Sequence, residues 1–332
     1  MATEKRVLLC AWAFRNAGPE PRRLLQEGGA TLAEVHLDRA LRVDELIEAL
    51  PGVVGTIAGN ERYTEEVFVA SPELRVVSRW GIGVDTVDLG AATRHGVVVT
   101  NTPRLTANGV ADYTFALMLA CARRVVEADR VVRENQWREL RGFDVWQQCL
   151  GIVGFGTIGQ AVARRARGFE MRILAYDPAP NEAAAQELGV ELVSLEYLLQ
   201  QADFVTLHAT VTDSSRGMMD AHALSLMKPT AFLLNMGRGA LVDEAALVAA
   251  LQSGALAGAA LDVHSAEPPG PDYPLAKLDN CLLSPHTASM SRGTIAAVSR
   301  RAALNLLEVL DGGRPEFVVN PEVYEVGLRP GV

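Results

Sequence analysis

A glycine-rich segment at residues 154–159 reads Gly-Phe-Gly-Thr-Ile-Gly and has the spacing of a turn that binds a pyrophosphate. It follows an apolar run that predicts a β-strand, and it opens a proline-free stretch, 160–168, that predicts a helix. In such a turn Gly154 permits the tight bend, Gly156 lets the backbone approach the phosphates, and Gly159 lets the helix pack on the strand. The helix N-terminus supplies N–H groups for the anion. The motif therefore predicts a dinucleotide-binding site.

Asp177 ends the next predicted strand, 18 residues after Gly159, and a carboxylate at about 20 residues is expected to bind the ribose hydroxyls. A 2′-phosphate would be repelled there, and residues 178–182 contain no arginine to receive one. We therefore predict NAD rather than NADP. A P-loop is excluded, because Gln160 and Ala161 stand where it needs Lys and Ser or Thr. The alternative, in which the glycines only form a turn and Asp177 only caps a loop, stays open.

Three later segments, each directly after a predicted strand, could bind an acid and move a proton. They read Asn-Met-Gly-Arg-Gly at 235–239, Leu-Asp-Val-His-Ser-Ala-Glu-Pro-Pro at 261–269 and Leu-Ser-Pro-His-Thr-Ala at 283–288. Ligands bind outside the carboxyl ends of parallel strands, so all three would face the cofactor. Arg238 could hold a carboxylate, His286 could take a hydroxyl proton and Glu267 could tune that base. Alone, each could be a surface charge or a histidine in a turn.

Short aliphatic runs alternate with helical patterns along the whole chain, which is typical of an α/β fold built on parallel sheets. The strands expected in the first block lie at 7–9, 53–58, 75–78 and 97–100. Six more are expected in the second block, at 150–153, 171–176, 204–207, 231–234, 259–262 and 281–283, and they suit a doubly wound sheet. One long, proline-free helix is expected over 108–134, with its apolar first half buried in the core or against a second subunit.

Composition and charge exclude several classes of protein. Among 332 residues, acidic side chains outnumber basic ones 40 to 31, giving a net charge of −9, so nucleic-acid binding is not expected. The most apolar stretch, 113–122, is shorter than the ~20 residues of a membrane span, and no signal peptide is visible at the start. The cysteines are too far apart to suggest a disulfide framework or a metal site; they are Cys10, Cys121, Cys149 and Cys281. A cytoplasmic protein with no membrane partner is expected.

Together these motifs make the chain similar to the D-isomer-specific 2-hydroxyacid dehydrogenases, in particular to the phosphoglycerate dehydrogenase-like branch. Beside the segments above, the resemblance rests on Ser-Arg-Trp-Gly-Ile-Gly-Val-Asp at 78–85, Asn-Thr-Pro at 101–103, Met-Lys-Pro at 227–229 and Val-Asn-Pro at 319–321. It implies an NAD-dependent oxidoreductase that moves a hydride between nicotinamide and C2 of a small 2-hydroxy acid.

The resemblance also implies an architecture. A Rossmann NAD-binding domain, residues 103–288, would be inserted into a flavodoxin-like substrate-binding domain made of residues 1–102 and 289–332. Family members usually form homodimers through the NAD-binding domain, so the same is expected here.

Roles for individual residues follow from the same resemblance. His286 is similar to the family's general acid/base, Glu267 to the carboxylate that orients it, and Arg238 to the arginine that binds the substrate carboxylate. The main-chain N–H groups of Ile82 and Gly83 resemble a second clamp on that carboxylate. Further residues match cofactor-binding positions, with Arg238 and His286 also facing the cofactor; they are Thr157, Ile158, Thr210, Met236, Gly237, Asp262 and Ala288.

Two departures from the family pattern bear on these roles. Thr210 stands where the family often has a proline, and Arg104 stands where it often has a small residue. Arg104 is either a plain surface charge or a cation for a second anionic group on the substrate.

The substrate stays open at this point. A phosphorylated 2-hydroxy acid would need cations, for which Arg62, Arg79 and Arg104 are candidates, whereas glyoxylate, hydroxypyruvate and other small 2-oxo acids would not. Formate dehydrogenase is disfavoured, because it generally has glutamine at the position of Glu267. An NAD(H)-sensing binding protein, like the transcriptional corepressors on this fold, is the alternative from another class.

Overall fold

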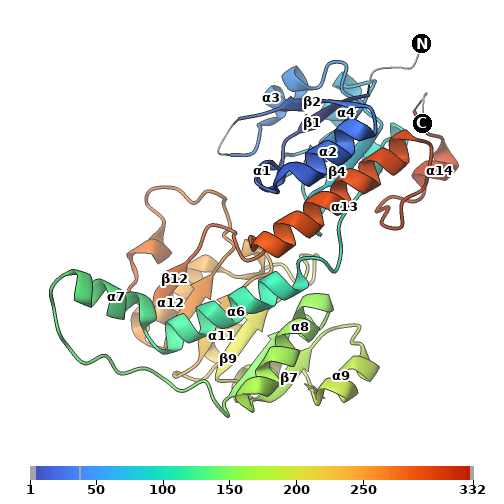
Figure 1. The fold of residues 1–332 in the computed structure, drawn as a ribbon. Helices are drawn as coiled ribbons and strands as arrows, with labels where there is room; N and C mark the ends of the chain where they lie inside the picture. Colours follow the sequence, from blue (N-terminus) through green and yellow to red (C-terminus); the bar gives the residue numbers. More distant parts are fainter. Residues whose placement is uncertain (1–4, 37–38, 330–332) are drawn as a thin grey trace. The chain divides into compact units, whose positions relative to one another are not determined.

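The computed structural model describes residues 5–36 and 39–329, which form two compact units (Figure 1). Unit 1 comprises Met1–Thr106 and Met290–Val332, and unit 2 comprises Ala107–Ser289. The chain thus leaves unit 1, completes unit 2 and returns. Within the described ranges, no helix combines the length and the apolar character needed to cross a membrane.

Unit 1 is built on a parallel sheet of five strands in the order β2-β1-β3-β4-β5. Its strands are β1 (Lys5–Leu9), β2 (Ala30–Glu34), β3 (Gly55–Ala58), β4 (Val76–Arg79) and β5 (Val98–Thr100). This is the flavodoxin-like order. Strand β2 is an addition to the four predicted strands, because its sequence, Ala-Thr-Leu-Ala-Glu, has few β-branched residues and only one fully buried position.

Helices cover both faces of this sheet and bury its aliphatic side chains. One face packs against α1 (Trp12–Arg15), α2 (Pro19–Glu27) and α13 (Arg292–Leu310). The other packs against α3 (Val43–Ala49), α4 (Glu65–Ala70) and α5 (Leu89–Arg94), and α14 (Val323–Val326) lies against α5. Helix α13 buries Val298, Ala302 and Leu306 at four-residue intervals, so the C-terminal part of the chain completes a core begun by its N-terminal part.

Unit 2 is built on a parallel sheet of seven strands in the order β12-β11-β10-β9-β6-β7-β8. Its strands are β6 (Cys149–Val153), β7 (Arg172–Tyr176), β8 (Glu191–Leu192), β9 (Phe204–Leu207), β10 (Phe232–Asn235), β11 (Gly258–Leu261) and β12 (Cys281–Leu283). The order reverses beside β6, as in a Rossmann fold. The predicted six strands are present, and β8 adds a short, exposed seventh.

Helices again cover both faces of the unit 2 sheet. One face packs against α6 (Ala107–Ala122), α8 (Thr157–Ala166) and α9 (Glu182–Leu188). The other packs against α10 (Leu195–Gln201), α11 (Ala221–Ser225) and α12 (Glu244–Ser253). Short 3₁₀ turns lie at Arg167–Phe169, Gly239–Leu241 and Pro274–Lys277.

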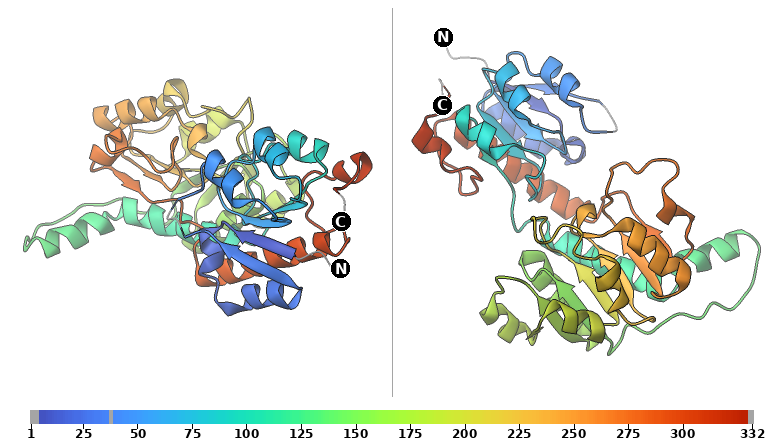
Figure 2. Two further views of the ribbon diagram at one scale, coloured as in Figure 1. Left: turned by 90° about the horizontal axis from the view of Figure 1, so that it is seen from above. Right: turned by 180° about the vertical axis from the view of Figure 1, so that it is seen from behind.

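The single long helix expected over 108–134 is wrong: the structure has two helices there, α6 and α7 (Val125–Arg133). They are separated at Arg124, whose φ of 52° is left-handed and ends helical hydrogen bonding. The apolar α6 lies in the core of its own unit, against β10, β11 and α8. Helix α7 extends away from the sheet, and the segment after it returns to the sheet, where Phe143 packs against Phe232 (Figure 2).

Candidate active site

The segments that hold the predicted catalytic residues leave three neighbouring strands of unit 2. Asn235 at the end of β10 pairs with Leu261 at the end of β11, and Leu261 pairs with Leu283 at the end of β12. Since all three strands are parallel, the residues that follow them gather at one edge of the sheet. Arg238, Glu267 and His286 therefore lie in loops at the same carboxyl edge, beside the glycine turn that follows β6.

His286 and Glu267 form a hydrogen-bonded pair. Nδ1 of His286 lies 2.7 Å from Oε2 of Glu267, and both side chains keep about a third of their surface exposed, at 35% and 30%. Partial burial would raise the pKa of the Glu267 carboxyl, but the hydrogen bond and charge of His286 outweigh it, so the pKa is lower than usual. Glu267 is therefore ionised near neutral pH. An ionised carboxylate only accepts, so Nδ1 carries the proton and Nε2 is left to exchange one.

Asp262 holds the loop that carries His286. It is 1% exposed, and its carboxylate accepts hydrogen bonds from Ser284 Oγ at 2.6 Å, Thr287 N at 2.9 Å and Ala288 N at 2.8 Å. These contacts keep His286 in a left-handed conformation, φ 50°, which few non-glycine residues adopt. Buried charges are stable only when such hydrogen bonds satisfy them, so Asp262 is a structural anchor of the site.

Asn235 shapes the turn that carries Arg238. Its Nδ2 donates to the Arg238 carbonyl at 2.8 Å, and its Oδ1 accepts the Gly237 N–H at 3.0 Å. A Cβ at Gly239 would lie 2.0 Å from the carbonyl carbon of His264, so only glycine fits there. The Arg238 side chain is partly buried, and its Nη1 donates to the Gly237 carbonyl at 2.9 Å. A planar guanidinium in this position can bind a carboxylate by two hydrogen bonds.

The glycine turn fits a dinucleotide pyrophosphate. Gly154 has φ 94°, and a Cβ there would lie 2.6 Å from Ala209 N, while a Cβ at Gly159 would lie 2.2 Å from the Gly154 carbonyl oxygen. At Gly156, by contrast, a Cβ would meet no atom within 4 Å, so the backbone there is open to a ligand. Gly156 is the N-cap of α8, so the first N–H groups of the helix, from Thr157 onward, are available to an anion.

Asp177 lies beside this turn, directly after β7. Its Oδ2 accepts the Phe155 N–H at 2.8 Å and its Oδ1 accepts the Ala179 N–H at 2.9 Å. The carboxylate thus supports the glycine turn, as the structural alternative proposed. Each oxygen has two acceptor sites, so one remains on each for ribose hydroxyls. The two interpretations are therefore compatible.

The other residues expected to contact the cofactor flank the same edge. Met236 and Gly237 are buried in the turn after β10, and Ala288 is buried beside Asp262. Thr210 is exposed after β9, where its carbonyl accepts Ser215 Oγ at 2.7 Å. All four follow strands of the unit 2 sheet, where the fold places ligands.

The segment with Ile82 and Gly83 follows β4 at the carboxyl edge of the unit 1 sheet. It is held by the next strand's loop: Asn101 Nδ2 donates to the Ile82 carbonyl at 2.9 Å, and Thr102 Oγ1 accepts the Gly81 N–H at 3.0 Å. Within the described chain, the N–H groups of Ile82 and Gly83 make no hydrogen bond. Both residues are partly exposed, so these donors are available to an anion.

The three arginines considered for a phosphate differ in environment. Arg79 is buried, and its guanidinium donates to the carbonyls of Ala58 and Trp80 and to Asn60 Oδ1. It therefore ties the ends of β3 and β4 together. Arg62 and Arg104 are exposed, and Arg104 has a left-handed φ of 69°.

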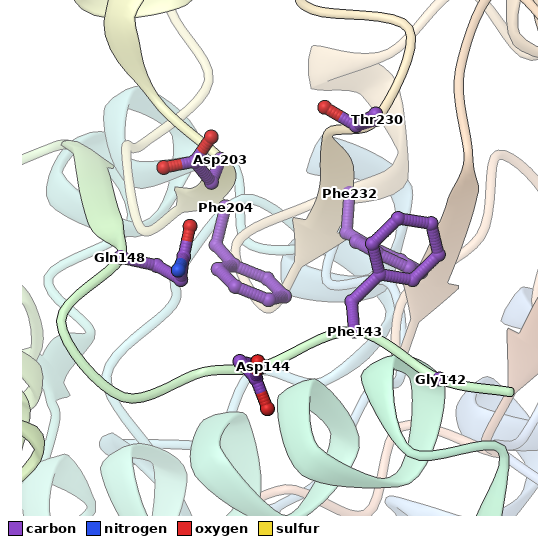
Figure 3. A pocket seen from close by; sticks show the side chains of 8 residues that line it. All are labelled: Gly142, Phe143, Asp144, Gln148, Asp203, Phe204, Thr230 and Phe232. Atoms are coloured by element: carbon purple, nitrogen blue, oxygen red, sulfur yellow. The ribbon is translucent and has the colours of Figure 1, made fainter.

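A pocket of about 300 Å³ lies at the opposite, amino-terminal edge of the unit 2 sheet (Figure 3). Phe143, Phe204 and Phe232 line it, and Asp203 at its wall is paired with Lys228 at 2.8 Å. His286 follows the carboxyl end of β12, at the other edge of the sheet, so the pocket is separate from it. No cluster of metal-ligating side chains occurs in the parts of the chain that the structure describes.

Comparison with known proteins identifies the family. Residues 115–288 match the model of the D-isomer specific 2-hydroxyacid dehydrogenase, NAD binding domain. The chain is 48% identical over 318 residues to the glyoxylate reductase of Korarchaeum cryptofilum, covering 92% of this chain and 96% of that protein. The glyoxylate reductase of Thermococcus kodakarensis is 42% identical over 307 residues, covering 90% and 89%.

Solved structures have the same fold. The crystal structure of the TT0316 protein from Thermus thermophilus has a TM-score of 0.87 and 39% sequence identity, and the match covers 95% of this chain and 99% of that one. The chain therefore belongs to the D-isomer specific 2-hydroxyacid dehydrogenase family. It is an NAD-dependent oxidoreductase that acts on CH–OH groups, as the sequence predicted.

Proposed function

We propose that the protein reduces a small, unphosphorylated 2-oxo acid of the glyoxylate type to the 2-hydroxy acid. The observation that carries the chemistry is the His286–Glu267 hydrogen bond at the strand edge that also holds Arg238. The substrate class is supported by the two relatives named glyoxylate reductase. When bound, NADH supplies the hydride for C2.

The proton step falls to Nε2 of His286. Glu267 accepts from Nδ1, so in the protonated ring Nε2–H is the free donor. During reduction Nε2–H donates its proton to the carbonyl oxygen of the substrate as that oxygen gains charge, and the ring becomes neutral. In the reverse direction neutral Nε2 takes the hydroxyl proton. Glu267 stabilises the charged ring throughout and fixes its orientation.

Substrate binding is assigned to one side chain and two main-chain groups. Arg238 would hold the substrate carboxylate through two hydrogen bonds and withdraw charge from the adjacent carbonyl. The N–H groups of Ile82 and Gly83 would donate to a substrate carboxylate, as the family resemblance implies, and they make no hydrogen bond within the described chain. Arg104 would attract acidic substrates, and Arg104→Ala should raise KM most for dianions such as 2-oxoglutarate.

Cofactor binding is assigned to the carboxyl edge of unit 2. The N–H groups of Thr157 and Ile158 would bind the pyrophosphate and Asp177 the ribose. The remaining contacts would come from the loops after the other strands; they are Thr210, Met236, Gly237, Arg238, Asp262, His286 and Ala288. Unit 2 would thus be the NAD-binding domain and unit 1 the substrate-binding domain, which is supported by the family model over 115–288.

A homodimer and a cytoplasmic location complete the proposal. Large apolar side chains are exposed on α7 and the segment after it; they are Val125, Val126, Val132, Trp137, Phe143 and Trp146. Trp137 is 92% exposed, and apolar patches of this kind mark protein interfaces. A second copy of unit 2 would cover them.

All four cysteines are free thiols, as in proteins of a reducing compartment, which supports the cytoplasmic location.

The substrate proposal is tested by NADH oxidation at neutral pH with glyoxylate, hydroxypyruvate, pyruvate, 2-oxoglutarate and phosphohydroxypyruvate. We expect the highest kcat/KM with glyoxylate or hydroxypyruvate, and less with NADPH. The commitment of Arg79 to main-chain carbonyls is the reason to expect little gain from a phosphate. A higher kcat/KM for phosphohydroxypyruvate than for hydroxypyruvate would contradict the unphosphorylated class.

A further inference from the structure

A second chain of hydrogen bonds lies behind the catalytic pair. Glu244, the first residue of α12, accepts the Ser265 N–H at 2.8 Å and the Tyr273 hydroxyl at 3.0 Å through Oε1, and the Ser265 hydroxyl at 2.8 Å through Oε2. The Tyr273 oxygen lies 3.1 Å from Nδ1 of His264, and the two rings meet edge to face. Nε2 of His264 lies 2.9 Å from the Ser284 carbonyl oxygen.

The donors in this chain can be assigned from chemistry. A carbonyl oxygen only accepts, so Nε2 of His264 carries a hydrogen. Burial and the adjacent Glu244 carboxylate raise the pKa of the Tyr273 phenol, so Tyr273 keeps its one proton. A neutral His264 ring with its hydrogen on Nε2 accepts at Nδ1, so the Tyr273 hydrogen is shared between Oε1 of Glu244 at 3.0 Å and Nδ1 of His264 at 3.1 Å. The ring is thus contacted by Ser284 at one end and by Tyr273 at the other.

His264 contacts all three loops that carry the proposed catalytic residues. Its main-chain N–H donates to Oε1 of Glu267 at 3.1 Å, the oxygen that His286 does not use. Its ring binds Ser284, two residues before His286. Its carbonyl group lies against Gly239, where no side chain fits. His264 is buried, so a movement of its ring would be transmitted to these loops.

We propose that Glu244, Tyr273 and His264 are positioning residues that hold the Glu267 carboxylate in register with His286. This inference rests on the proposed function, because it assigns the acid–base step to that pair. The three residues do not touch the reacting atoms; they act through Glu267. Removing such an outer hydrogen bond should lower kcat, because it loosens the group that orients His286.

The test is a double-mutant cycle on kcat with Tyr273→Phe and Glu267→Gln. Tyr273→Phe removes one hydroxyl and keeps the ring that packs on His264. We expect kcat to fall three- to tenfold in the wild-type background, with the Kd for NADH unchanged. In the Glu267→Gln background the same change should cost less than twofold. Equal losses in both backgrounds, or no loss in the wild type, would overturn the proposal.

Two further variants serve as a control and as a second test. Tyr197→Phe removes an exposed hydroxyl on α10 and should leave kcat unchanged. Glu244→Gln keeps the shape of the side chain and weakens its bond to Tyr273, so it should reproduce the loss if Tyr273→Phe lowers Tm strongly. A normal kcat for Glu244→Gln in a folded protein would count against the proposal.

A readout without turnover separates this inference from the proposed function. In the cofactor-free protein, we expect a downfield NMR signal from the Nδ1–H proton of His286 bound to Glu267, assigned by its loss in His286→Asn. We expect this signal to broaden or move upfield in Tyr273→Phe and to stay in place in Tyr197→Phe. If no 2-oxo acid is reduced, the proposed function fails while this result still decides the positioning role; an unchanged signal in Tyr273→Phe overturns it.

Discussion

The main-chain carbonyl of Asp262 accepts the N–H of His286 at 2.8 Å, so the residue directly after β11 holds a residue three positions beyond β12. The Asp262 side chain then accepts from the two residues that follow His286. A parallel pair of strands brings these loops together, and a buried carboxylate fixes their conformation. Together the contacts stabilise a left-handed histidine, a conformation that costs about 1–3 kcal/mol in most non-glycine residues.

Asp262→Asn should therefore lower both stability and activity. The amide has one acceptor oxygen, so at least one buried N–H or the Ser284 hydroxyl loses its partner, at about 1–3 kcal/mol. We expect a lower Tm and a kcat reduced about tenfold or more. Asp243→Asn is the matched control, because Asp243 caps α12 through two N–H groups at an exposed position. It should lower Tm slightly and leave kcat alone; equal kcat values for both variants would contradict the assignment.

The glycine turn allows a sharper separation of folding from cofactor binding. Gly156→Ala adds a methyl group that meets no protein atom within 4 Å, so Tm should be unchanged while the Kd for NADH rises about tenfold. Gly159→Ala puts its methyl 2.2 Å from the Gly154 carbonyl oxygen, so Tm and NADH binding should both fall. Calorimetry and fluorescence titration measure the two effects. Normal NADH affinity in Gly156→Ala would show that the pyrophosphate lies elsewhere.

Much of this arrangement could be predicted from the sequence, because apolar runs and glycine spacing report local structure directly. All the predicted strands are present. Strands β2 and β8 could not be predicted, since one has weak β propensity and the other is two exposed residues long. The break between α6 and α7 has no glycine or proline to mark it; it depends on the conformation of Arg124.

The site also has one part that local sequence patterns predict and one part that they do not. Residue type and position after a strand predicted that Arg238, Glu267 and His286 follow neighbouring strands at one edge of the sheet, and the structure places them there. The anchoring contacts of Asp262 and His264 could not be predicted, because they depend on which strands are neighbours and in what register. A buried aspartate that accepts three hydrogen bonds has the same sequence signal as one that binds a ligand. Long-range pairing is the information that a local pattern lacks.

His286 and Glu267 should differ in the size of their contribution. His286→Asn removes the group proposed to exchange the proton, and general acid–base catalysis contributes about 10²- to 10⁴-fold, so kcat should fall within that range. Glu267→Gln keeps an acceptor for Nδ1 and removes the charge, so a smaller loss is expected. Single-turnover kinetics with NADH measures both. A larger loss for Glu267→Gln than for His286→Asn would contradict the roles proposed for them.

Glu267 also makes a prediction about acid pH. Its pKa is lower in the folded protein than in the unfolded chain, so its pairing stabilises the fold above about pH 4.5 and is lost as pH falls through the folded pKa. Between pH 5 and pH 9 Glu267 stays ionised. We therefore expect that the pH profile of kcat in this window is not shaped by Glu267 titration. Measuring kcat of wild type and Glu267→Gln between pH 5 and pH 9 tests this expectation. The two pH profiles should show the same number of ionisations.

His208 should make the free energy of unfolding decrease as the pH is lowered, at pH values above those at which the carboxylates titrate. Burial lowers the pKa of its ring to about 3; Nε2 lies 3.0 Å from Thr206 Oγ1, and Nδ1 is buried without a partner in the described chain. Unfolded histidine titrates near 6.5, so between pH 6.5 and 3 the unfolded chain binds the extra proton and folding is disfavoured. The free energy of unfolding should fall by about 2 kcal/mol from pH 8 to pH 5 through this residue.

Urea unfolding of wild type and His208→Asn at pH 8 and pH 5 isolates the contribution of His208. The variant should lose about 2 kcal/mol less than wild type over this interval, because it has no ring to protonate. His222→Asn provides the matched control, since His222 is exposed at the start of α11 and should leave the wild-type slope unchanged. Parallel pH slopes for His208→Asn and wild type would mean that the folded ring gains its proton over the same pH range as in the unfolded chain, and this result would remove His208 as the source of acid sensitivity.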